Sequence, residues 1–240
     1  MKTLEQKISV KPFQFKQFAI QQSKDVFRVG TDGVLLGAAS SVERAQNILE
    51  VGTGTGLVSL MIAQRNVKAQ IHAIDINEKA VALAAENFEH SPFRNRLSIS
   101  RKDYKEFSPN EKYDLIISNP PYFEENQSNK DIIARQQTEL SFELLIEKSK
   151  HLLTENGLLS VIIPYEAGVL FEEICLRNQL LLKSRLQIYG ILNSKPKRLL
   201  LEFGTEQIET IQENLIIEKS PRQYSEQYLK LTEEFHVFNK

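Results

Sequence analysis

The sequence contains a single cysteine, Cys175, among its 240 residues. One cysteine cannot form an internal disulfide, and neither a second cysteine nor a closely spaced histidine stands beside it as a metal ligand. We therefore expect Cys175 to be a core residue and the protein to bind no metal. Long apolar runs are also missing: no segment approaches the roughly 20 apolar residues of a membrane helix, and residues 1–7 lack the apolar segment of a signal peptide. These absences predict a soluble, cytoplasmic protein with no membrane partner.

Acidic and basic residues nearly balance, but they are unevenly distributed. A chain of 240 residues with 41% hydrophobic and 25% charged residues is typical of one globular domain. The formal net charge of −1 by itself argues against a nucleic-acid partner. Three segments, residues 1–24, 90–102 and 174–201, are nevertheless basic, and the last contains no acidic residue. Each segment can be an ordinary solvated face, or together they can form a surface that binds phosphate groups.

The first 43 residues are predicted to be an extension that precedes the core. The alternation in Phe13-Gln14-Phe15-Lys16-Gln17-Phe18 predicts a strand over residues 13–18. Residues 31–39 predict a helix that begins with Thr31 or Asp32 as N-cap and carries small residues on one face for close packing. Asp32 is then either only a cap or a carboxylate that faces a cationic ligand, and the sequence favours neither interpretation.

A glycine-rich turn lies between a predicted strand, residues 47–51, and a predicted helix, residues 57–63. The turn has the spacing G-x-G-x-G, formed by Gly52, Gly54 and Gly56. Glycines allow a tight turn and leave no Cβ between the main chain and a ligand, which suits a nucleotide-like group at the carboxyl edge of a parallel sheet. The spacing differs from the G-x-G-x-x-G of dinucleotide folds, so a pyrophosphate on the helix N-terminus is less favoured.

One further strand ends in an acidic residue, and another is followed closely by one. Asp75 ends a predicted strand over residues 70–75, where a carboxylate can accept both hydroxyls of a ribose. It could instead cap the following helix, but Asn77 is better placed for that. Asp103 and Tyr104 follow a predicted strand over residues 97–100, and they either hold an adenine amine and ring or only shape a turn.

The motif Asn119-Pro120-Pro121-Tyr122, followed by Phe123, comes directly after an apolar strand over residues 113–118. The two prolines fix φ and remove two N–H donors, so the loop presents its carbonyl groups in set directions. With the amide of Asn119 and two aromatic rings, this loop suits a planar group that carries an NH₂, such as adenine. The alternative is an ordinary proline-rich turn. The polar loop over residues 124–130 can act as a lid.

The second half of the chain predicts three more strands and two helices. We expect a helix over residues 140–153 that ends at Asn156-Gly157, a strand over 158–164, a helix over 166–178 and a strand over 180–189. The seventh strand, residues 199–203, follows a connection of about seven residues. That connection is too short for a helical crossover, so this strand should be antiparallel.

These motifs together resemble those of S-adenosylmethionine-dependent amino-methyltransferases. Four further segments show a narrower resemblance to the bacterial tRNA1(Val) adenine-37 N6-methyltransferases. They are residues 13–18, residues 29–37, the step Ala134-Arg135 and Lys195-Pro196-Lys197-Arg198. The resemblance implies an α/β fold with a Rossmann-like, seven-stranded class I methyltransferase sheet, mostly parallel with its last strand antiparallel. It also implies an N-terminal extension (1–43), a methyltransferase core (44–205) and a C-terminal tail packed on the core (206–240).

The same resemblance implies S-adenosyl-L-methionine as cofactor and methylation of N6 of adenine 37 in the anticodon loop of a valine tRNA, by a monomer. The implied catalytic residues are Asn119, Pro120, Pro121 and Tyr122. The implied cofactor-binding residues are Thr31, Asp32, Glu50, Gly52, Gly54, Gly56, Asp75, Ile76, Asp103, Tyr104 and Asn119. The implied RNA-binding residues are Phe123, Arg135, Lys195, Lys197 and Arg198.

Two alternatives stay open on the sequence. Related Asn-Pro-Pro-Tyr enzymes methylate a glutamine side chain of a protein or adenines in other nucleic acids. The glutamine enzymes, however, have a separate N-terminal helical domain that this sequence lacks. A non-enzymatic RNA-binding scaffold is the other alternative, and the intact glycines, Asp75 and Asn119 argue against it.

Overall fold

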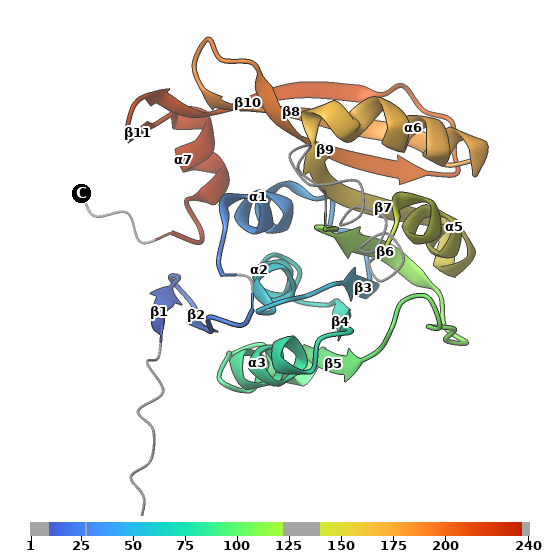
Figure 1. Ribbon diagram of the computed structural model, residues 1–240, viewed down its shortest axis with the longest axis horizontal. Coiled ribbons are helices and arrows are strands. Elements are labelled where there is room, and N and C mark those ends of the chain that lie inside the picture. The colour runs from blue at the N-terminus through green and yellow to red at the C-terminus, as the bar shows by residue number, and fades with distance from the viewer. Residues whose placement is uncertain (1–9, 27, 122–139, 237–240) are drawn as a thin grey trace, which may run out of the picture.

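A computed structural model describes residues 10–26, 28–121 and 140–236, and its centre is a nine-stranded sheet (Figure 1). The strands lie in the order β11-β10-β8-β9-β7-β6-β3-β4-β5. Their bounds are β3 Asn47–Val51, β4 Gln70–Asp75, β5 Leu97–Arg101, β6 Tyr113–Ser118, β7 Leu153–Pro164, β8 Leu181–Ile191, β9 Pro196–Gly204, β10 Ile211–Ser220 and β11 Gln223–Tyr224. A separate hairpin pairs β1 (Val10–Gln14) with β2 (Ala19–Gln22).

Helices cover both faces of the sheet, so its central strands are buried on both sides. The helices are α1 Thr31–Ala39, α2 Leu57–Arg65, α3 Glu78–Glu89, α5 Phe142–Leu152, α6 Gly168–Arg177 and α7 Glu226–Thr232, with short 3-10 helices at Arg94–Arg96 and Tyr165–Ala167. One hydrophobic cluster joins α5 and α6 to the sheet, and two others join it to α1, α2, α3 and α7. Burial on both faces explains why β6 is a nearly continuous apolar run. No helix in the described part of the chain is long and apolar enough to span a membrane.

The direction of β9 agrees with the prediction. It is antiparallel to both β7 and β8, and it follows β8 through a short connection. The strands β3 to β9 correspond to the seven strands predicted for the core. β10 adds to them in parallel beside β8, and β11 pairs antiparallel with β10, so residues from Ile211 onward extend the sheet.

One predicted strand and one predicted helix end are wrong. Residues 13–18 do not form one strand, because the chain turns between β1 and β2, with the Phe15 N–H bonded to the Phe18 carbonyl at 2.9 Å. The rings of Phe15 and Phe18 stack across that turn with their centroids 4.7 Å apart. The regular spacing of the aromatic residues therefore belongs to a hairpin and not to a single strand. The helix α5 ends at Leu152 rather than at Asn156-Gly157. Gly157 lies inside β7, where a Cβ would stand 2.8 Å from the Tyr113 carbonyl oxygen, so its glycine allows close strand packing.

Helices α1 and α2 cross closely because α1 has glycines on the contact face. A Cβ on Gly33 would lie 3.1 Å from Cδ2 of Leu57, and one on Gly37 would lie 2.8 Å from Cβ of Met61. The predicted small-residue face is thus confirmed. It brings the first turn of α1 against the first turn of α2.

Candidate active site

Three parallel strands end side by side at one edge of the sheet. Val51, the last residue of β3, is paired with Ile74 of β4 and with Ser118 of β6. The glycine turn therefore lies between the end of β4, which carries Asp75, and the end of β6, which leads into Asn119 (Figure 1). Ligands of open α/β sheets bind at this carboxyl edge.

The three glycines of the turn have different surroundings. All three have positive φ, at 76° for Gly52, 58° for Gly54 and 81° for Gly56. A Cβ on Gly52 or Gly54 would meet nothing within 4 Å, whereas one on Gly56 would lie 2.5 Å from Cε1 of Phe88. Gly52 and Gly54 thus border open space that a ligand can fill, and Gly56 is required by packing against α3.

Glu50 supports this turn from beneath. The residue is 3% exposed, and its Oε2 accepts hydrogen bonds from Thr53 Oγ1 at 2.8 Å and from the Ser59 N–H at 3.0 Å. It also contacts the Ser59 hydroxyl. Burial raises the pKa of Glu50 to about 7, although these donors act in the opposite direction. Glu50 therefore fixes the shape of the glycine turn from the buried side.

Asp75 connects the glycine turn to the start of α3. Its Oδ2 accepts the Gly54 N–H and its Oδ1 accepts the Asn77 N–H, both at 2.9 Å. Asn77 is the N-cap of α3, with its side chain accepting from Lys79 and Ala80, as the sequence predicted. Ile76 beside it is 56% exposed. An apolar side chain next to a carboxylate offers one surface for a base and one acceptor for a ribose.

Asp103 and Tyr104 follow β5 in a short turn. Asp103 Oδ1 accepts the Lys105 N–H at 2.9 Å. Tyr104 is buried, and its hydroxyl lies 3.1 Å from Ser149 Oγ. Burial raises the pKa of Tyr104 above its ordinary value. These contacts fit the interpretation that the pair shapes a turn, and their contact with a ligand stays a prediction.

The proline motif begins directly beside the glycine turn. Ser118 Oγ donates to the Val51 carbonyl at 2.9 Å, which ties the end of β6 to the end of β3. Asn119 and Pro121 are exposed at this edge, and Pro120 is buried. Tyr122, Phe123 and Arg135 lie outside the described residues, as does the polar loop over residues 124–130.

Asp32 does not cap α1. The N-cap is Gly30, and no side chain caps this helix. Asp32 Oδ2 instead accepts a hydrogen bond from Arg198 Nε at 2.9 Å. Thr31 begins the helix at this point, while Lys195 and Lys197 are exposed in and after the short connection between β8 and β9.

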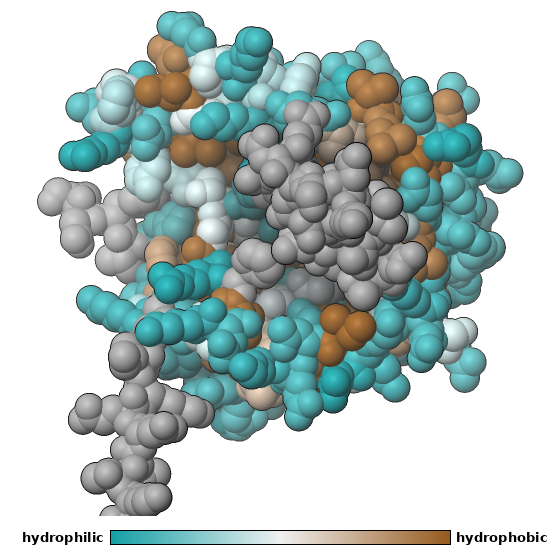
Figure 2. Space-filling view, in the orientation of Figure 1, coloured by the Kyte–Doolittle hydropathy of each residue, from teal (hydrophilic) through white to brown (hydrophobic). Residues whose placement is uncertain are grey.

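One aromatic residue at this edge was missed by sequence reasoning. Tyr165 directly follows Pro164, the last residue of β7, and β7 lies beside β6. Tyr165 is partly exposed, and exposed apolar side chains continue from it along α6 at Val169 and Leu170. Figure 2 shows hydrophobic side chains gathered over α6. The available signal was an aromatic residue immediately after an apolar strand, the same signal as in the proline motif.

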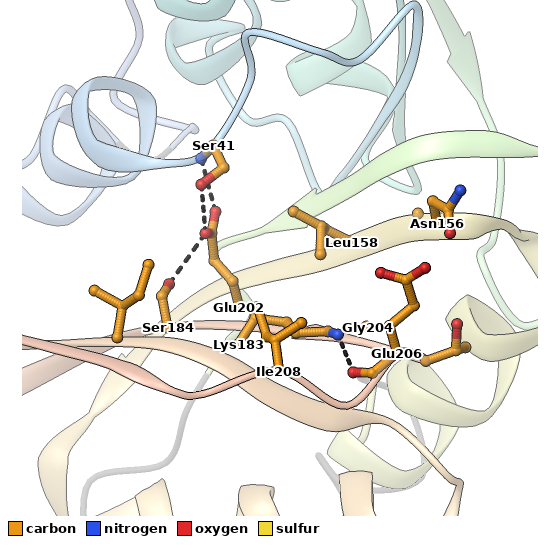
Figure 3. Close-up of a pocket in the computed structure, with 12 residues that line it drawn as sticks. Ser41, Asn156, Leu158, Lys183, Ser184, Glu202, Gly204, Glu206 and Ile208 are labelled. Atoms are coloured by element: carbon orange, nitrogen blue, oxygen red, sulfur yellow. Dashed lines mark hydrogen bonds between the residues drawn. The ribbon is translucent and has the colours of Figure 1, made fainter.

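A cavity of about 210 Å³ lies at the opposite edge of the sheet (Figure 3). Glu202, a buried residue of β9, accepts hydrogen bonds there from the Ser41 N–H and Ser41 Oγ, both at 2.7 Å, and from Ser184 Oγ at 3.0 Å. Lys183 contacts the Glu206 carbonyl in the same cavity. The carboxylate of Glu202 thus ties the segment after α1 to two strands, a structural role far from Asn119.

Comparison with known proteins identifies the family. A model described as methyltransferase small domain matches residues 22–174. The chain belongs to this family. A tRNA1(Val) (adenine(37)-N6)-methyltransferase of Flavobacteriaceae bacterium (strain 3519-10) is 56% identical over 95% of this chain and 100% of its own length. A protein of the same name from Flavobacterium psychrophilum is 41% identical over 94% of this chain and 99% of its own.

Solved structures show the same fold as this methyltransferase. A predicted O-methyltransferase from Agrobacterium tumefaciens, protein Atu636, aligns with a TM-score of 0.67 and 18% identity, covering 85% of this chain and 96% of its own. The N-methyltransferase NodS from Bradyrhizobium japonicum, in complex with S-adenosyl-l-homocysteine, aligns with a TM-score of 0.52 and 19% identity, covering 71% and 82%. The predicted Rossmann-like methyltransferase fold is therefore confirmed.

Proposed function

We propose that this methyltransferase transfers a methyl group from S-adenosyl-L-methionine to N6 of adenine 37 in the anticodon loop of a valine tRNA, as a cytoplasmic monomer. The observation that carries the proposal is the position of Asn119 and Pro120 beside the glycine turn, fixed by the bond from Ser118 to Val51. The names of relatives at 56% and 41% identity support the same substrate.

The residues around the glycine turn fit the cofactor. Open space at Gly52 and Gly54 leaves room for a ligand against the main chain, and the carboxylate of Asp75 stands at the edge of that space. Ile76 is exposed and offers an apolar surface for adenine. We assign the methionine end of the cofactor to the start of α1, at Thr31 and Asp32. When bound, S-adenosylmethionine supplies an electrophilic methyl group on a positively charged sulfur.

Asn119 and Pro120 would activate the acceptor amine. The lone pair of an exocyclic adenine amine is delocalised into the ring, so the amine is a poor nucleophile. The Asn119 side-chain oxygen and the Pro120 carbonyl can accept hydrogen bonds from its two N–H groups and favour a tetrahedral nitrogen with a localised lone pair. After methyl transfer, the positively charged nitrogen loses one proton to water. Acceptors fixed in advance stabilise the developing positive charge without reorganisation, and no strong base is required.

A single-stranded base and its phosphates need different contacts. Bases swung out of an RNA loop are held by stacking on aromatic side chains. Tyr122 and Phe123 are expected to do this, and the partly exposed Tyr165 stands at the neighbouring strand end. Lys195 and Lys197 are exposed on the same edge and suit phosphate groups.

The proposal is tested by incubating the protein with labelled S-adenosylmethionine and unmodified total tRNA, followed by nucleoside analysis. Wild type should form N6-methyladenosine in valine tRNA. Asn119→Ala should lower the rate about 10²–10³-fold, as expected for loss of one transition-state hydrogen bond. Asn110→Ala, an exposed asparagine in the turn before β6, is the matched control and should keep the rate. Methylation of protein glutamine or of other RNA instead of tRNA would overturn the substrate assignment, and absence of any transfer would favour the scaffold.

A further inference from the structure

Tyr165 is an exposed aromatic residue that directly follows the carboxyl end of β7. Its exposed fraction is 42%. Among the residues that the structure describes, its hydroxyl has no hydrogen-bond partner and its ring stacks on no other ring. Tyr104 and Tyr113 differ, because their hydroxyls are hydrogen bonded and their rings are buried. The ring of Tyr165 therefore has an apolar face that a ligand can cover.

The position of Tyr165 follows from the lengths of two neighbouring strands. Ser118, the last residue of β6, is paired with Val161, and β7 continues from there to Pro164. Tyr165 thus comes after β7 has passed the level at which the proline motif begins. At roughly 3.3 Å per residue, it lies about 13 Å beyond Ser118 in the direction of the strands. It borders the proposed site on the β7 side, next to the loop that contains Asn119.

The backbone at Tyr165 is held in place by two contacts. Its carbonyl accepts a hydrogen bond from the N–H of Gly168, at the end of the short 3-10 helix Tyr165–Ala167. Gly168 itself packs closely on β9, since a Cβ there would lie 2.3 Å from Cδ1 of Leu199. An aromatic side chain on a fixed backbone loses little conformational entropy on binding, because only two side-chain dihedrals are free. Tyr165 is therefore suited to stacking on a planar ligand.

Charges on the two sides of Tyr165 differ in sign. Arg198 of β9 is paired with Pro164 of β7. The residues next to this pair, Tyr165 and Lys197, therefore come at the same level of the sheet edge. Lys197 is exposed there, whereas the exposed residue that leads from Tyr165 toward α6 is Glu166. A chain of phosphate groups is attracted to the β9 side and repelled from the α6 side, which gives an RNA strand one preferred path past the ring.

A base that leaves the stack of an RNA loop exposes one face of its neighbour. Enzymes that modify a base take it out of the stack, so the neighbouring base loses a stacking partner. Aromatic side chains provide such stacking contacts to single-stranded RNA. We propose that Tyr165 stacks on the base of a nucleotide next to adenine 37, with the phosphate chain on the side of Lys197. This inference rests on the proposed function and adds an RNA contact to it.

The first test is binding of the anticodon stem-loop RNA of valine tRNA to the full chain with S-adenosylhomocysteine bound. Tyr165→Ala should weaken RNA binding about 5–150-fold, the range found when a stacked aromatic residue is removed. Tyr165→Phe keeps the ring and should bind as wild type does. Both variants should keep the affinity for S-adenosylhomocysteine and the rate of methylation at saturating RNA. Tyr224→Ala is the matched control, because Tyr224 is 43% exposed on β11, at the end of the strand order, and should leave RNA binding unchanged.

The second test uses stem-loop RNAs that lack a single base. Removal of the base on either the 5′ or the 3′ side of adenine 37 should abolish the difference between wild type and Tyr165→Ala, and removal of adenine 37 itself should preserve it. A difference that disappears only without adenine 37 would overturn the inference, because the ring would then hold the target base. A difference that no missing base removes would also overturn it and would show a structural effect.

Two results separate this inference from the proposed function. If wild type neither binds nor methylates the stem-loop or the intact tRNA, the proposed function itself fails. If wild type methylates the RNA and Tyr165→Ala binds it as wild type does, only the stacking role of Tyr165 fails.

Discussion

Gly56 and Phe88 approach so closely that a Cβ on the glycine would lie 2.5 Å from Cε1 of the ring. Gly52 and Gly54, only a few residues before, would carry a Cβ without meeting any atom within 4 Å. One motif therefore contains two kinds of glycine. Gly56 serves the packing of the turn against α3, and the other two border the open side where we propose that the cofactor binds.

Alanine substitutions should separate these two roles. Gly56→Ala should lower the free energy of unfolding by about 2–4 kcal/mol, because it adds overpacking against Phe88 to the strain of a positive φ. Gly54→Ala should lower it by only about 1–2 kcal/mol. It should nevertheless weaken S-adenosylhomocysteine binding at least about tenfold, since its methyl group enters the ligand space. Urea unfolding and calorimetry measure the two effects, and equal losses of stability would contradict the distinction.

The buried Glu50 should make stability depend on pH. Its pKa is about 7 in the folded protein against an ordinary value of 4.5, so the folded state binds more protons between these pH values. Protonated Glu50 therefore makes its whole contribution to the free energy of unfolding below about pH 4.5. This contribution is lost as the pH rises through about 7. The difference between the two pKa values corresponds to about 3 kcal/mol.

Glu50→Gln should remove this dependence. Relative to wild type, the variant should gain stability between pH 5 and pH 8, as measured by urea unfolding at both. Glu106→Gln, which alters an exposed carboxylate, is the control and should follow wild type at both. A constant difference between wild type and Glu50→Gln across this range would show that Glu50 remains ionised.

Asn87 should be required for the attachment of the N-terminal hairpin. Its buried amide accepts the Gln21 N–H at 2.8 Å and donates to the carbonyls of Gln21 at 3.2 Å and Thr55 at 2.8 Å. Asn87→Leu leaves these groups without their partner and should cost about 2–4 kcal/mol of stability. Glu86→Leu, at the exposed neighbouring position, should change stability by less than about 0.5 kcal/mol. Thermal unfolding of both variants tests this, and equal melting temperatures would contradict it.

Asp75→Asn should reduce the free energy of cofactor binding more than it reduces the free energy of unfolding. The asparagine side chain has one acceptor oxygen, whereas the carboxylate has two. It therefore cannot accept hydrogen bonds from the N–H groups of Gly54 and Asn77 and from a ribose as well. We expect S-adenosylhomocysteine affinity to fall about 10–100-fold by calorimetry. Asp25→Asn, which alters an exposed carboxylate paired with Lys79, is the control. Unchanged affinity of Asp75→Asn would exclude a ribose contact.

Lys195 and Lys197 should contribute to tRNA affinity by binding phosphate groups. The double variant Lys195→Gln/Lys197→Gln should bind valine tRNA more weakly, and the slope of log K against log salt should become shallower by about 0.7–0.9 for each phosphate that is no longer neutralised. Lys68→Gln, an exposed lysine before β4 at the opposite edge of the sheet, should keep both quantities. A weaker complex with an unchanged salt slope would argue against phosphate binding by these lysines.

Local patterns predicted the sheet core and the positions of the motifs. The glycine turn, Asp75 and Asn119-Pro120 each follow a strand directly, and parallel strands end at one edge, so their proximity followed from chain order. Residues 13–18 and Gly157 misled the prediction because the same local signal fits two structures. Alternating aromatics fit a strand or a hairpin, and Asn-Gly fits a helix end or a close strand contact.

The sequence by itself determined the class of fold, because this depends on short-range periodicity and on turn residues. The family followed from the resemblance of its motifs, and the positions of those motifs predicted the edge of the sheet at which we propose that the chemistry occurs. Only the tertiary structure paired Asp32 with Arg198, placed Asn87 between the hairpin and the glycine turn, and added β10 to the sheet. These contacts join residues far apart in the chain. No local preference encodes them, since they arise from the way in which helices and strands pack once the sheet has formed.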